Sequence, residues 1–233
     1  MNAERGAGGT PVLVPSLLAC DPGCIAKQMQ LAEQGGAARW HLDIMDGHFV
    51  ENLSYGVHVC QGLGKYTSLP IDAHLMVTNP ASHIYPFIQA GARSVTIHSE
   101  AGAGSELRAL LKDIRKAGRL SGISLCPGTP VEDLCGVLPY SDIALLMSVH
   151  PGKGGQKFLP GSLGRIAQLR ELIDKINPGC ELQVDGGITM ENAVMCVRSG
   201  ASALIAGSSV FGVQDIAQRC RDFCESIARN AVT

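Results

Sequence analysis

The residues of this chain that are best placed to do chemistry lie in one segment, His41 to Val50, which reads His-Leu-Asp-Ile-Met-Asp-Gly-His-Phe-Val. The segment begins as an apolar strand after Trp40 and ends in a turn rich in ionisable residues. His41 and Asp43 are two positions apart, so in a strand their side chains point to the same face. An imidazole and a carboxylate on one face suit a metal ion or a proton transfer. Taken alone, the pair instead favours a structural role, with hydrogen bonds satisfying both groups at a sheet edge.

Composition and charge limit the classes of function. The chain has 233 residues, of which 45% are hydrophobic and 17% charged, a balance typical of globular proteins. A net charge of −2 and a pI of about 6.4, without a basic cluster, argue against a nucleic-acid partner. No apolar run approaches the ~18 residues that a membrane helix needs. An anionic ligand must therefore be held locally, for example by backbone amides.

The nine cysteines are an odd number and contain no Cys-x-x-Cys pair. Cys20 and Cys24 are four residues apart, as are Cys220 and Cys224. A disulfide framework or a zinc ribbon does not fit a chain of this length. The pattern favours reduced thiols that fill core space, and we expect a cytoplasmic protein.

Strand-like and helix-like segments alternate along the chain. The predicted strands are 12–14, 39–43, 70–77, 94–97, 120–125, 142–149, 180–184 and 201–206. The predicted helices are 24–34, 57–63, 80–91, 107–118, 131–137, 162–176, 189–200 and 216–227, with Ser162 and Thr189 as caps. Eight such units predict an α/β fold, a single (β/α)₈ TIM barrel with its active site at the carboxyl-terminal ends of the strands.

A doubly wound open sheet is the main alternative, but no Gly-x-Gly-x-x-Gly follows the first strand. The first ten residues carry Glu4 and Arg5 among glycines, so we expect a flexible N-terminal tail over 1–11. Because no shift in composition divides the rest of the chain, we expect one catalytic barrel domain over 12–233.

Polar groups are unusually dense where the predicted strands end. They are Ser16, His41, Asp43, His74, His98, Glu100, Cys126, Met147 to His150, Asp185, Gly207 and Ser208. Burying one unpaired carboxylate there costs several kcal/mol, so these groups require partners or a ligand.

Four of these groups form a predicted metal site: His41, Asp43, His74 and Asp185. Two imidazoles and two carboxylates suit one divalent ion, Zn²⁺, Fe²⁺, Mn²⁺ or Co²⁺, without a thiol. Alone, His74 would be interpreted as a core histidine whose hydrogen bonds are made within the protein. The three other candidate ligands at neighbouring strand ends change that interpretation. Three methionines near the same ends, Met45, Met76 and Met147, could form a dry collar over a reacting centre.

Three glycine clusters also close neighbouring strands, at 151–156, 185–187 and 206–209. Any one of them could simply permit a tight turn. Together they favour a phosphate cradle, because barrels of this kind often bind phosphate after strands seven and eight. The segment 150–156 is also the natural candidate for a mobile lid.

Two carboxylates from opposite sides of a barrel suit one particular reaction. Asp43 and Asp185 could remove a proton from one face of a carbon and return it on the other, while a metal stabilises the enediolate. This is epimerisation next to a ketone. An aldolase would more often present a lysine at a strand end, and Lys153 lies instead in the glycine loop.

The motifs Ser16-Leu-Leu, His41 to Val50, His74-Leu-Met-Val, Met147-Ser-Val, Pro151-Gly-x-Gly-Gly-Gln, Val184-Asp-Gly-Gly-Ile and Ala206-Gly-Ser together resemble the ribulose-phosphate 3-epimerase family, collinearly over 12–211. The resemblance implies interconversion of D-ribulose 5-phosphate and D-xylulose 5-phosphate in the pentose phosphate pathway. It implies that Asp43 and Asp185 are the catalytic acid/base pair and that His41, Asp43, His74 and Asp185 hold the metal. It also implies a cytoplasmic homo-oligomer, with substrate contacts from Ser16, His74, Gly152, Lys153, Gly154, Gly155, Asp185, Gly186, Gly187, Gly207 and Ser208.

Three residues depart from the family pattern. Glu51 stands where proline is usual, Lys153 where an aromatic is usual, and His150 where an amide or acidic residue is more common. All three border the side where substrate enters, so D-allulose 6-phosphate is an alternative substrate. A barrel that binds a phosphometabolite without turnover is a second alternative. The two carboxylates and two histidines argue against it, because a pure binder needs no acid on each face.

Overall fold

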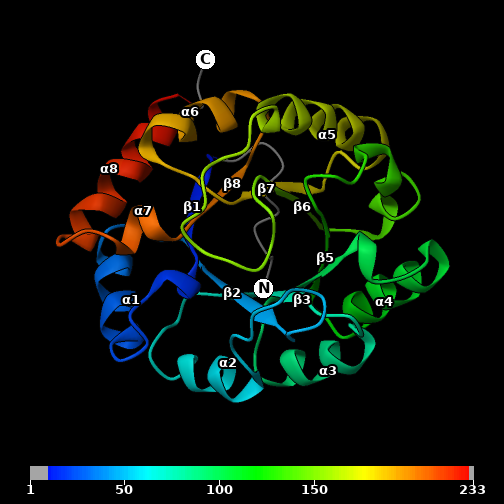
Figure 1. The fold of residues 1–233 in the computed structure, drawn as a ribbon, viewed down its shortest axis with the longest axis horizontal. Helices are drawn as coiled ribbons and strands as arrows, with labels where there is room; N and C mark the ends of the chain where they lie inside the picture. The colour runs from blue at the N-terminus through cyan, green and yellow to red at the C-terminus, as the bar shows by residue number, and fades with distance from the viewer. Residues whose placement is uncertain (1–9, 231–233) are drawn as a thin grey trace.

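Strands and helices alternate along the chain and close into a ring, as the computed structural model shows (Figure 1). The structure describes residues 10–230. The predicted tail over 1–11 therefore lies almost entirely outside the described residues. The eight strands are β1 (Val12–Pro15), β2 (Trp40–Met45), β3 (Ile71–Met76), β4 (Ser94–His98), β5 (Leu120–Leu125), β6 (Ile143–Met147), β7 (Glu181–Asp185) and β8 (Ala203–Ala206).

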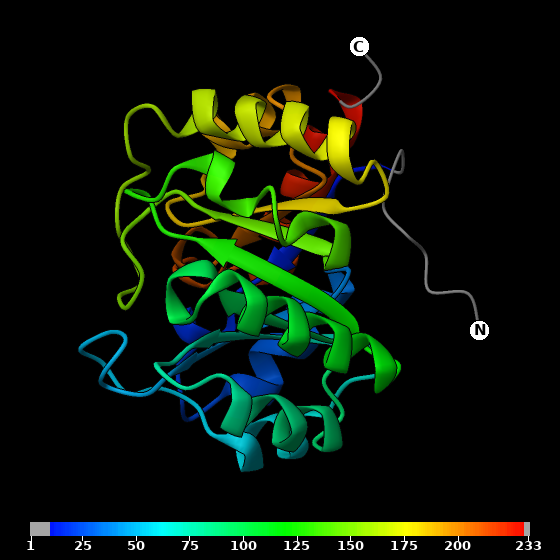
Figure 2. The same ribbon diagram turned by 90° about the vertical axis from the view of Figure 1, so that its right-hand side faces the viewer.

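The helices follow the strands on the outside of the ring, which is clear in Figures 1 and 2. They are α1 (Ile25–Gln34), α2 (Val57–Leu63), α3 (Ala81–Gln89), α4 (Gly104–Lys116), α5 (Ser162–Ile176), α6 (Met190–Arg198), α7 (Ser208–Phe211) and α8 (Ile216–Arg229). Four short 3₁₀ turns complete the described elements: η1 (Leu17–Ala19), η2 (Ser99–Ala101), η3 (Val131–Leu134) and η4 (Leu138–Tyr140).

All strand pairs in the sheet are parallel, in the order β1-β8-β7-β6-β5-β4-β3-β2. The ends of this order, β1 and β2, meet at a parallel bridge between Ser16 and His41. The predicted (β/α)₈ barrel is therefore confirmed. The bridge also brings Ser16 beside the segment that carries the candidate chemistry.

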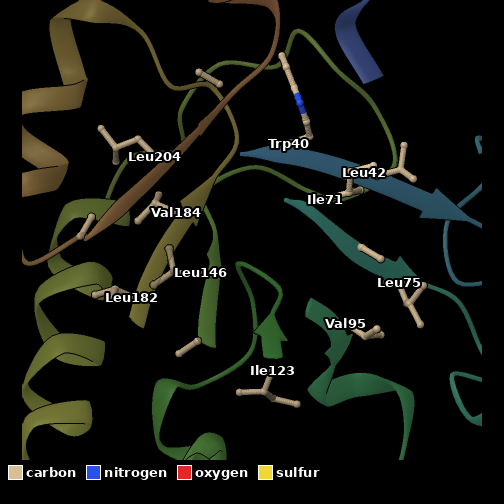
Figure 3. Packing of buried hydrophobic residues seen from close by; sticks show 14 of the residues in the cluster. Trp40, Leu42, Ile71, Leu75, Val95, Ile123, Leu146, Leu182, Val184 and Leu204 are labelled. Carbon is tan, nitrogen blue, oxygen red and sulfur yellow. The ribbon is translucent and has the colours of Figure 1, made fainter. Parts of the chain in front are cut away.

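The barrel forms because alternate strand residues face opposite layers. One set packs between the sheet and the helices, and Figure 3 shows its labelled members arranged along successive strands. In β2 this set is Trp40, Leu42 and Ile44, which are all buried. Their neighbours His41 and Asp43 must then point into the barrel, where β6 and β8 contribute a separate apolar cluster that includes Leu145 and Ile205.

The interior at the amino ends of the strands is occupied by a buried ion-pair cluster. Arg39 Nε lies 2.9 Å from Asp72 Oδ2, and its guanidinium also contacts the Glu181 carboxylate. Arg93 adds a second contact to Asp72 at 3.2 Å. Charged groups thus line both ends of the barrel interior, and those at this end are already paired with one another.

Two local predictions were wrong. Where an α-helix was predicted over 131–137, the structure has only the 3₁₀ turn η3, and a second 3₁₀ turn, η4, follows it. Ser162 does not cap α5: it is the first helical residue, and Gly161 precedes it in the left-handed conformation at φ 85°. The cap at Thr189 is confirmed, and its backbone N–H donates to Asn192 Oδ1 at 2.8 Å.

All nine cysteines lie in the described range and are free, as predicted. Five of them are buried: Cys20, Cys60, Cys180, Cys196 and Cys220. Between residues 10 and 230, no helix combines the length and apolarity needed to cross a membrane.

Candidate active site

The four predicted metal ligands converge at the carboxyl end of the barrel. His41 and Asp43 come from β2, His74 from β3 and Asp185 from the last position of β7. Asp43 and His74 are directly paired in the β2–β3 register. One ligand atom from each of the four residues lies within 4.8 Å of all the others. The barrel therefore brings together groups that are up to 144 positions apart in the chain (185 − 41).

The spacing of these atoms fits a small divalent ion. His41 Nε2 lies 3.1 Å from Asp43 Oδ1, 3.2 Å from His74 Nδ1 and 3.8 Å from Asp185 Oδ2. A first-row ion about 2.1 Å from each of four tetrahedral ligands would hold them roughly 3.4 Å apart. The two nitrogens and two oxygens suit Zn²⁺ or a neighbouring transition metal. The ligand set therefore accommodates one metal ion after small adjustments.

The protein groups alone give these four side chains different protonation preferences. Burial opposes a charged His41, but the carboxylates of Asp43 and Asp185 outweigh it and raise the pKa of His41 to about 9. Burial also disfavours the Asp43 carboxylate, yet the charge of His41 and the hydrogen bond from it hold the pKa of Asp43 well below its ordinary value. Burial and the negative charge of Asp43 raise the pKa of Asp185 to about 7. The pKa values of the two carboxyl groups are thus shifted in opposite directions, so that Asp43 is ionised and Asp185 more readily carries a proton.

Ser16 lies at the end of β1 and contacts the same group. Its hydroxyl donates a hydrogen bond to Asp43 Oδ2 at 2.7 Å, while Asp43 Oδ1 faces the two histidines. The Ser16 oxygen also accepts the Leu18 N–H at 3.3 Å, which begins η1. The two oxygens of Asp43 therefore have different environments, one towards the two histidines and one towards Ser16.

A cleft of about 550 Å³, counting space open to solvent, lies above the four ligands. Ten of the predicted substrate contacts line it: Ser16, Gly152, Lys153, Gly154, Gly155, Asp185, Gly186, Gly187, Gly207 and Ser208. His74 is fully buried beneath the cleft and does not line it, so its substrate contact stays a prediction. Met45, Met76 and Met147 line the cleft and are nearly fully buried, as a dry collar requires.

Glycine is required at two positions on the rim. Gly186 has φ +117° and Gly187 has φ +62°, both in the region that disfavours side chains. A Cβ on Gly187 would lie 2.3 Å from the backbone nitrogen of Phe158, and one on Gly186 would lie 2.3 Å from Val149 Cγ2. The loop after β7 therefore packs directly against the loop after β6, with no room for a side chain between them.

Asp46 organises the turn that follows β2. Its Oδ1 accepts the N–H groups of His48 and Phe49, each at 2.8 Å. Its Oδ2 accepts the N–H of Thr78 at 2.8 Å and the Thr78 hydroxyl at 2.9 Å. Although burial opposes it, this set of donors lowers the pKa of Asp46. Asp46 thus ties the β2–α2 loop to the β3–α3 loop, a structural role in a turn.

The three departures from the family pattern line one groove between two loops. Glu51 belongs to the β2–α2 loop, whereas His150 and Lys153 belong to the β6–α5 loop. Figure 2 shows both loops, cyan and yellow-green, projecting from the same end of the barrel. Asn52 Nδ2 donates to the Gly152 carbonyl at 2.6 Å and connects them. Closure of 150–156 as a lid stays a prediction.

One group of residues was noted in the sequence as strand-end polar groups without a role. His98, Glu100 and Cys126 lie at the ends of β4 and β5, beside His74. His98 Nε2 is 2.9 Å from His74 Nε2, and His98 Nδ1 is 3.1 Å from Glu100 Oε2. The sequence feature that could have identified this group is the His-x-acid spacing of His98 and Glu100, which is the same as that of His41 and Asp43.

The chain matches known proteins over nearly its whole length. The model of the ribulose-phosphate 3 epimerase family matches residues 12–211. A ribulose-phosphate 3-epimerase of Aquifex aeolicus (strain VF5) is 41% identical over 222 residues, which cover 95% of this chain and 99% of the relative. A chloroplastic ribulose-5-phosphate-3-epimerase of Arabidopsis thaliana is 37% identical over 217 residues, 93% of this chain and 77% of the relative.

Solved structures share the fold at low identity. KGPDC from Streptococcus mutans superposes with a TM-score of 0.71 at 17% identity, covering 95% of this chain and 99% of that chain. A 3-hexulose-6-phosphate synthase gives a TM-score of 0.67 at 16% identity, covering 94% of this chain and 100% of the other. These two likenesses concern the barrel architecture alone.

Proposed function

Because the chain belongs to the ribulose-phosphate 3-epimerase family, we propose that it interconverts D-ribulose 5-phosphate and D-xylulose 5-phosphate by inverting C3. The relatives that match it over most of its length carry this activity in their names. The protein is accordingly an epimerase that acts on a carbohydrate phosphate and serves the pentose phosphate pathway. Residues 12–233 form its catalytic barrel domain in this proposal.

The observation that carries the proposal is the set of four ligands at the floor of the cleft. Asp43 and Asp185 stand on β2 and β7 and reach the same centre, with ligand atoms within 4.8 Å of each other. A protein that only binds a phosphometabolite gains nothing from two carboxylates this close together, because their repulsion costs stability. An enzyme that must exchange a proton on both faces of one carbon requires them.

The roles of the two carboxylates follow from their environments. Asp43, kept ionised by His41, accepts the C3 proton from one face of the sugar. Asp185, whose pKa is raised by burial and by Asp43, delivers a proton to the opposite face. In the reverse direction the two residues exchange roles, as microscopic reversibility requires. The Ser16 hydroxyl orients Asp43 from the side away from the histidines and is close enough to contact the substrate.

One divalent cation, Zn²⁺, Fe²⁺, Mn²⁺ or Co²⁺, held by His41, Asp43, His74 and Asp185, would supply a Lewis acid that lowers the energy of negative charge beside C3. Met45, Met76 and Met147 keep bulk water from the reacting carbon and from a charged intermediate.

The glycine loops at the rim are suited to the phosphate end of the substrate. Gly152 to Gly155, Gly186, Gly187, Gly207 and Ser208 line the same cleft, and the glycines have no side chain to keep an anion from their backbone N–H groups. Lys153 adds a cation to this rim. Because the chain has a net charge of −2, such local recognition is needed to hold an anion. By analogy with the family we also propose a cytoplasmic homo-oligomer.

Hydrogen exchange at C3 tests the proposal directly. Wild-type protein with D-ribulose 5-phosphate in deuterated water should form D-xylulose 5-phosphate and introduce deuterium at C3, followed by ¹H NMR. D-allulose 6-phosphate, tested in parallel, measures the preference between five-carbon and six-carbon substrates. Absence of label from C3 of both sugars would contradict the epimerase function and leave a binding role.

A further inference from the structure

A line of hydrogen-bonded side chains runs from the predicted metal site to the outer end of β5. On the side of its ring away from the predicted metal site, His74 Nε2 lies 2.9 Å from His98 Nε2. His98 in turn directs Nδ1 to Glu100 Oε2 at 3.1 Å. His74 and His98 are both fully buried, and their rings stack with centroids 5.0 Å apart. Bulk water therefore cannot take the place of either partner.

The hydrogens on this line can be assigned from its far end. Glu100 Oε1 accepts the Cys126 N–H at 2.8 Å and also the Thr129 hydroxyl. An ionised carboxylate only accepts, so Oε2 must receive a hydrogen from His98 Nδ1. A neutral His98 then has no hydrogen on Nε2, which accepts one from His74 Nε2. A neutral His74 is left with a lone pair on Nδ1.

That lone pair points at the metal site. His74 Nδ1 lies 3.1 Å from Asp43 Oδ1 and 3.2 Å from His41 Nε2. With the hydrogens assigned as above, His74 Nδ1 and Asp43 Oδ1 are two acceptors facing each other, so they require either a cation between them or the N–H of His41 Nε2, which lies 3.2 and 3.1 Å from the two atoms. The same arrangement makes His74 a ready metal ligand through Nδ1.

We propose that Glu100 and His98 are positioning residues that hold His74 in the tautomer with its hydrogen on Nε2, so that Nδ1 is free to bind the metal. The proposal rests on the metal site of the proposed function. Neither residue touches substrate, and both act through His74. A carboxylate behind a ligating histidine is a recurring way to fix the ring and raise its basicity, and here a second histidine extends the line.

A second metal bound by His98, Glu100 and Cys126 fits these residues less well. Both oxygens of Glu100 already accept hydrogens from protein donors. Burial, followed by the charge of Glu100, raises the pKa of the Cys126 thiol to about 12, which opposes the thiolate that a metal needs. Arg165 Nη2 also binds the carbonyls of Cys126 and Thr129, at 3.0 and 2.7 Å, and so fixes the loop that supplies the donors to Glu100.

The isosteric variant Glu100→Gln should reverse the direction of every hydrogen bond between residue 100, His98 and His74. The Cys126 N–H and the Thr129 hydroxyl must still be accepted, so the amide oxygen turns to them and the amide NH₂ turns to His98 Nδ1. His98 then carries its hydrogen on Nε2 and donates to His74 Nε2. This places the His74 hydrogen on Nδ1, the atom that must bind the metal.

Two measurements test the inference. In metal-free wild type, ¹⁵N NMR of the imidazoles should show His74 and His98 as neutral rings, protonated on Nε2 and Nδ1 respectively. Titration with Zn²⁺ or Co²⁺ should show a metal affinity about 10- to 100-fold weaker in Glu100→Gln than in wild type. Glu132→Gln makes the same chemical change at an exposed position on η3 and should bind like wild type.

The outcomes separate the alternatives. His74 protonated on Nδ1 in the wild type, or unchanged metal affinity in a folded Glu100→Gln, would overturn the positioning role. Two metal equivalents in wild type, falling to one in Cys126→Ser, would replace it with a second metal site. If Glu100→Gln does not fold, the tautomers measured in the wild type still show whether His98 and Glu100 hold His74 with its hydrogen on Nε2. A wild type that binds no divalent ion contradicts the metal in the proposed function, and the tautomers of the metal-free protein remain a separate test.

Discussion

Replacing Asp185 by asparagine should separate the two halves of the proposed reaction. The variant keeps the shape of the side chain but cannot take up or deliver a proton at this position. The backbone should hold its place, because the Asp185 carbonyl accepts both the N–H of Ser148 at 2.8 Å and the Ser148 hydroxyl at 2.9 Å. Asp43, with its hydrogen bond from Ser16, remains intact.

The expected loss can be estimated from the role of the group. One positioned acid or base contributes about 10²- to 10⁴-fold, so interconversion of the two pentulose phosphates should slow by that factor. This equals about 3 to 5 kcal/mol of transition-state stabilisation. Asp43 should still remove and return the C3 proton on its own face. One of the two epimers should therefore exchange C3 hydrogen with solvent deuterium, without conversion to the other.

The assay follows C3 exchange by NMR from each pure epimer in deuterated water, with metal content measured on the same samples. Asp43→Asn is the matched control and should exchange only the opposite epimer, if it retains metal. Equal exchange of both epimers in each variant, or interconversion near the wild-type rate in Asp185→Asn, would refute the assignment of one carboxylate to each face.

Three further predictions concern the metal, the barrel interior and the rim. A strong chelator should abolish activity, and a divalent ion should restore it; full turnover by protein shown to be metal-free would contradict the metal's role. Arg39→Met should lower the free energy of unfolding by about 3 to 5 kcal/mol in denaturant titrations, because Asp72 and Glu181 lose a buried partner. Gly187→Ala should raise KM for the sugar phosphate and lower Tm, because its Cβ would lie 2.3 Å from the Phe158 backbone nitrogen.

Matched variants sharpen two of these tests. Adding Glu181→Gln to Arg39→Met removes one of the uncompensated charges and should recover part of the lost stability. Gly164→Ala lies in α5, where a Cβ meets nothing within 4 Å, and should be neutral or slightly stabilising. A Gly187→Ala protein with unchanged KM and Tm would mean that the loops after β6 and β7 are not packed as tightly as described.

The sequence by itself predicted the barrel, and it singled out the four residues of the proposed metal site before their positions were known. Alternation of period two in the strands and apolar spacing in the helices are local signals, and eight repeats of them leave few topologies. His41 and Asp43 could be placed on one face because a strand has only two faces. Assigning His74 and Asp185 to the same centre needed only the rule that functional residues gather at the carboxyl ends of barrel strands.

Tertiary structure decided what those residues touch. Three features depend on strand register and on closure of the β1–β2 bridge: which oxygen of Asp43 faces Ser16, how the charges of His41 and Asp43 separate the pKa values of Asp43 and Asp185, and which nitrogen of His74 faces the proposed metal site. These relations join residues far apart in the chain, so no local pattern contains them. The line from His74 through His98 to Glu100 is of the same kind: His98 and Glu100 stood out in the sequence, but only the packed barrel gives them a partner and hence a role.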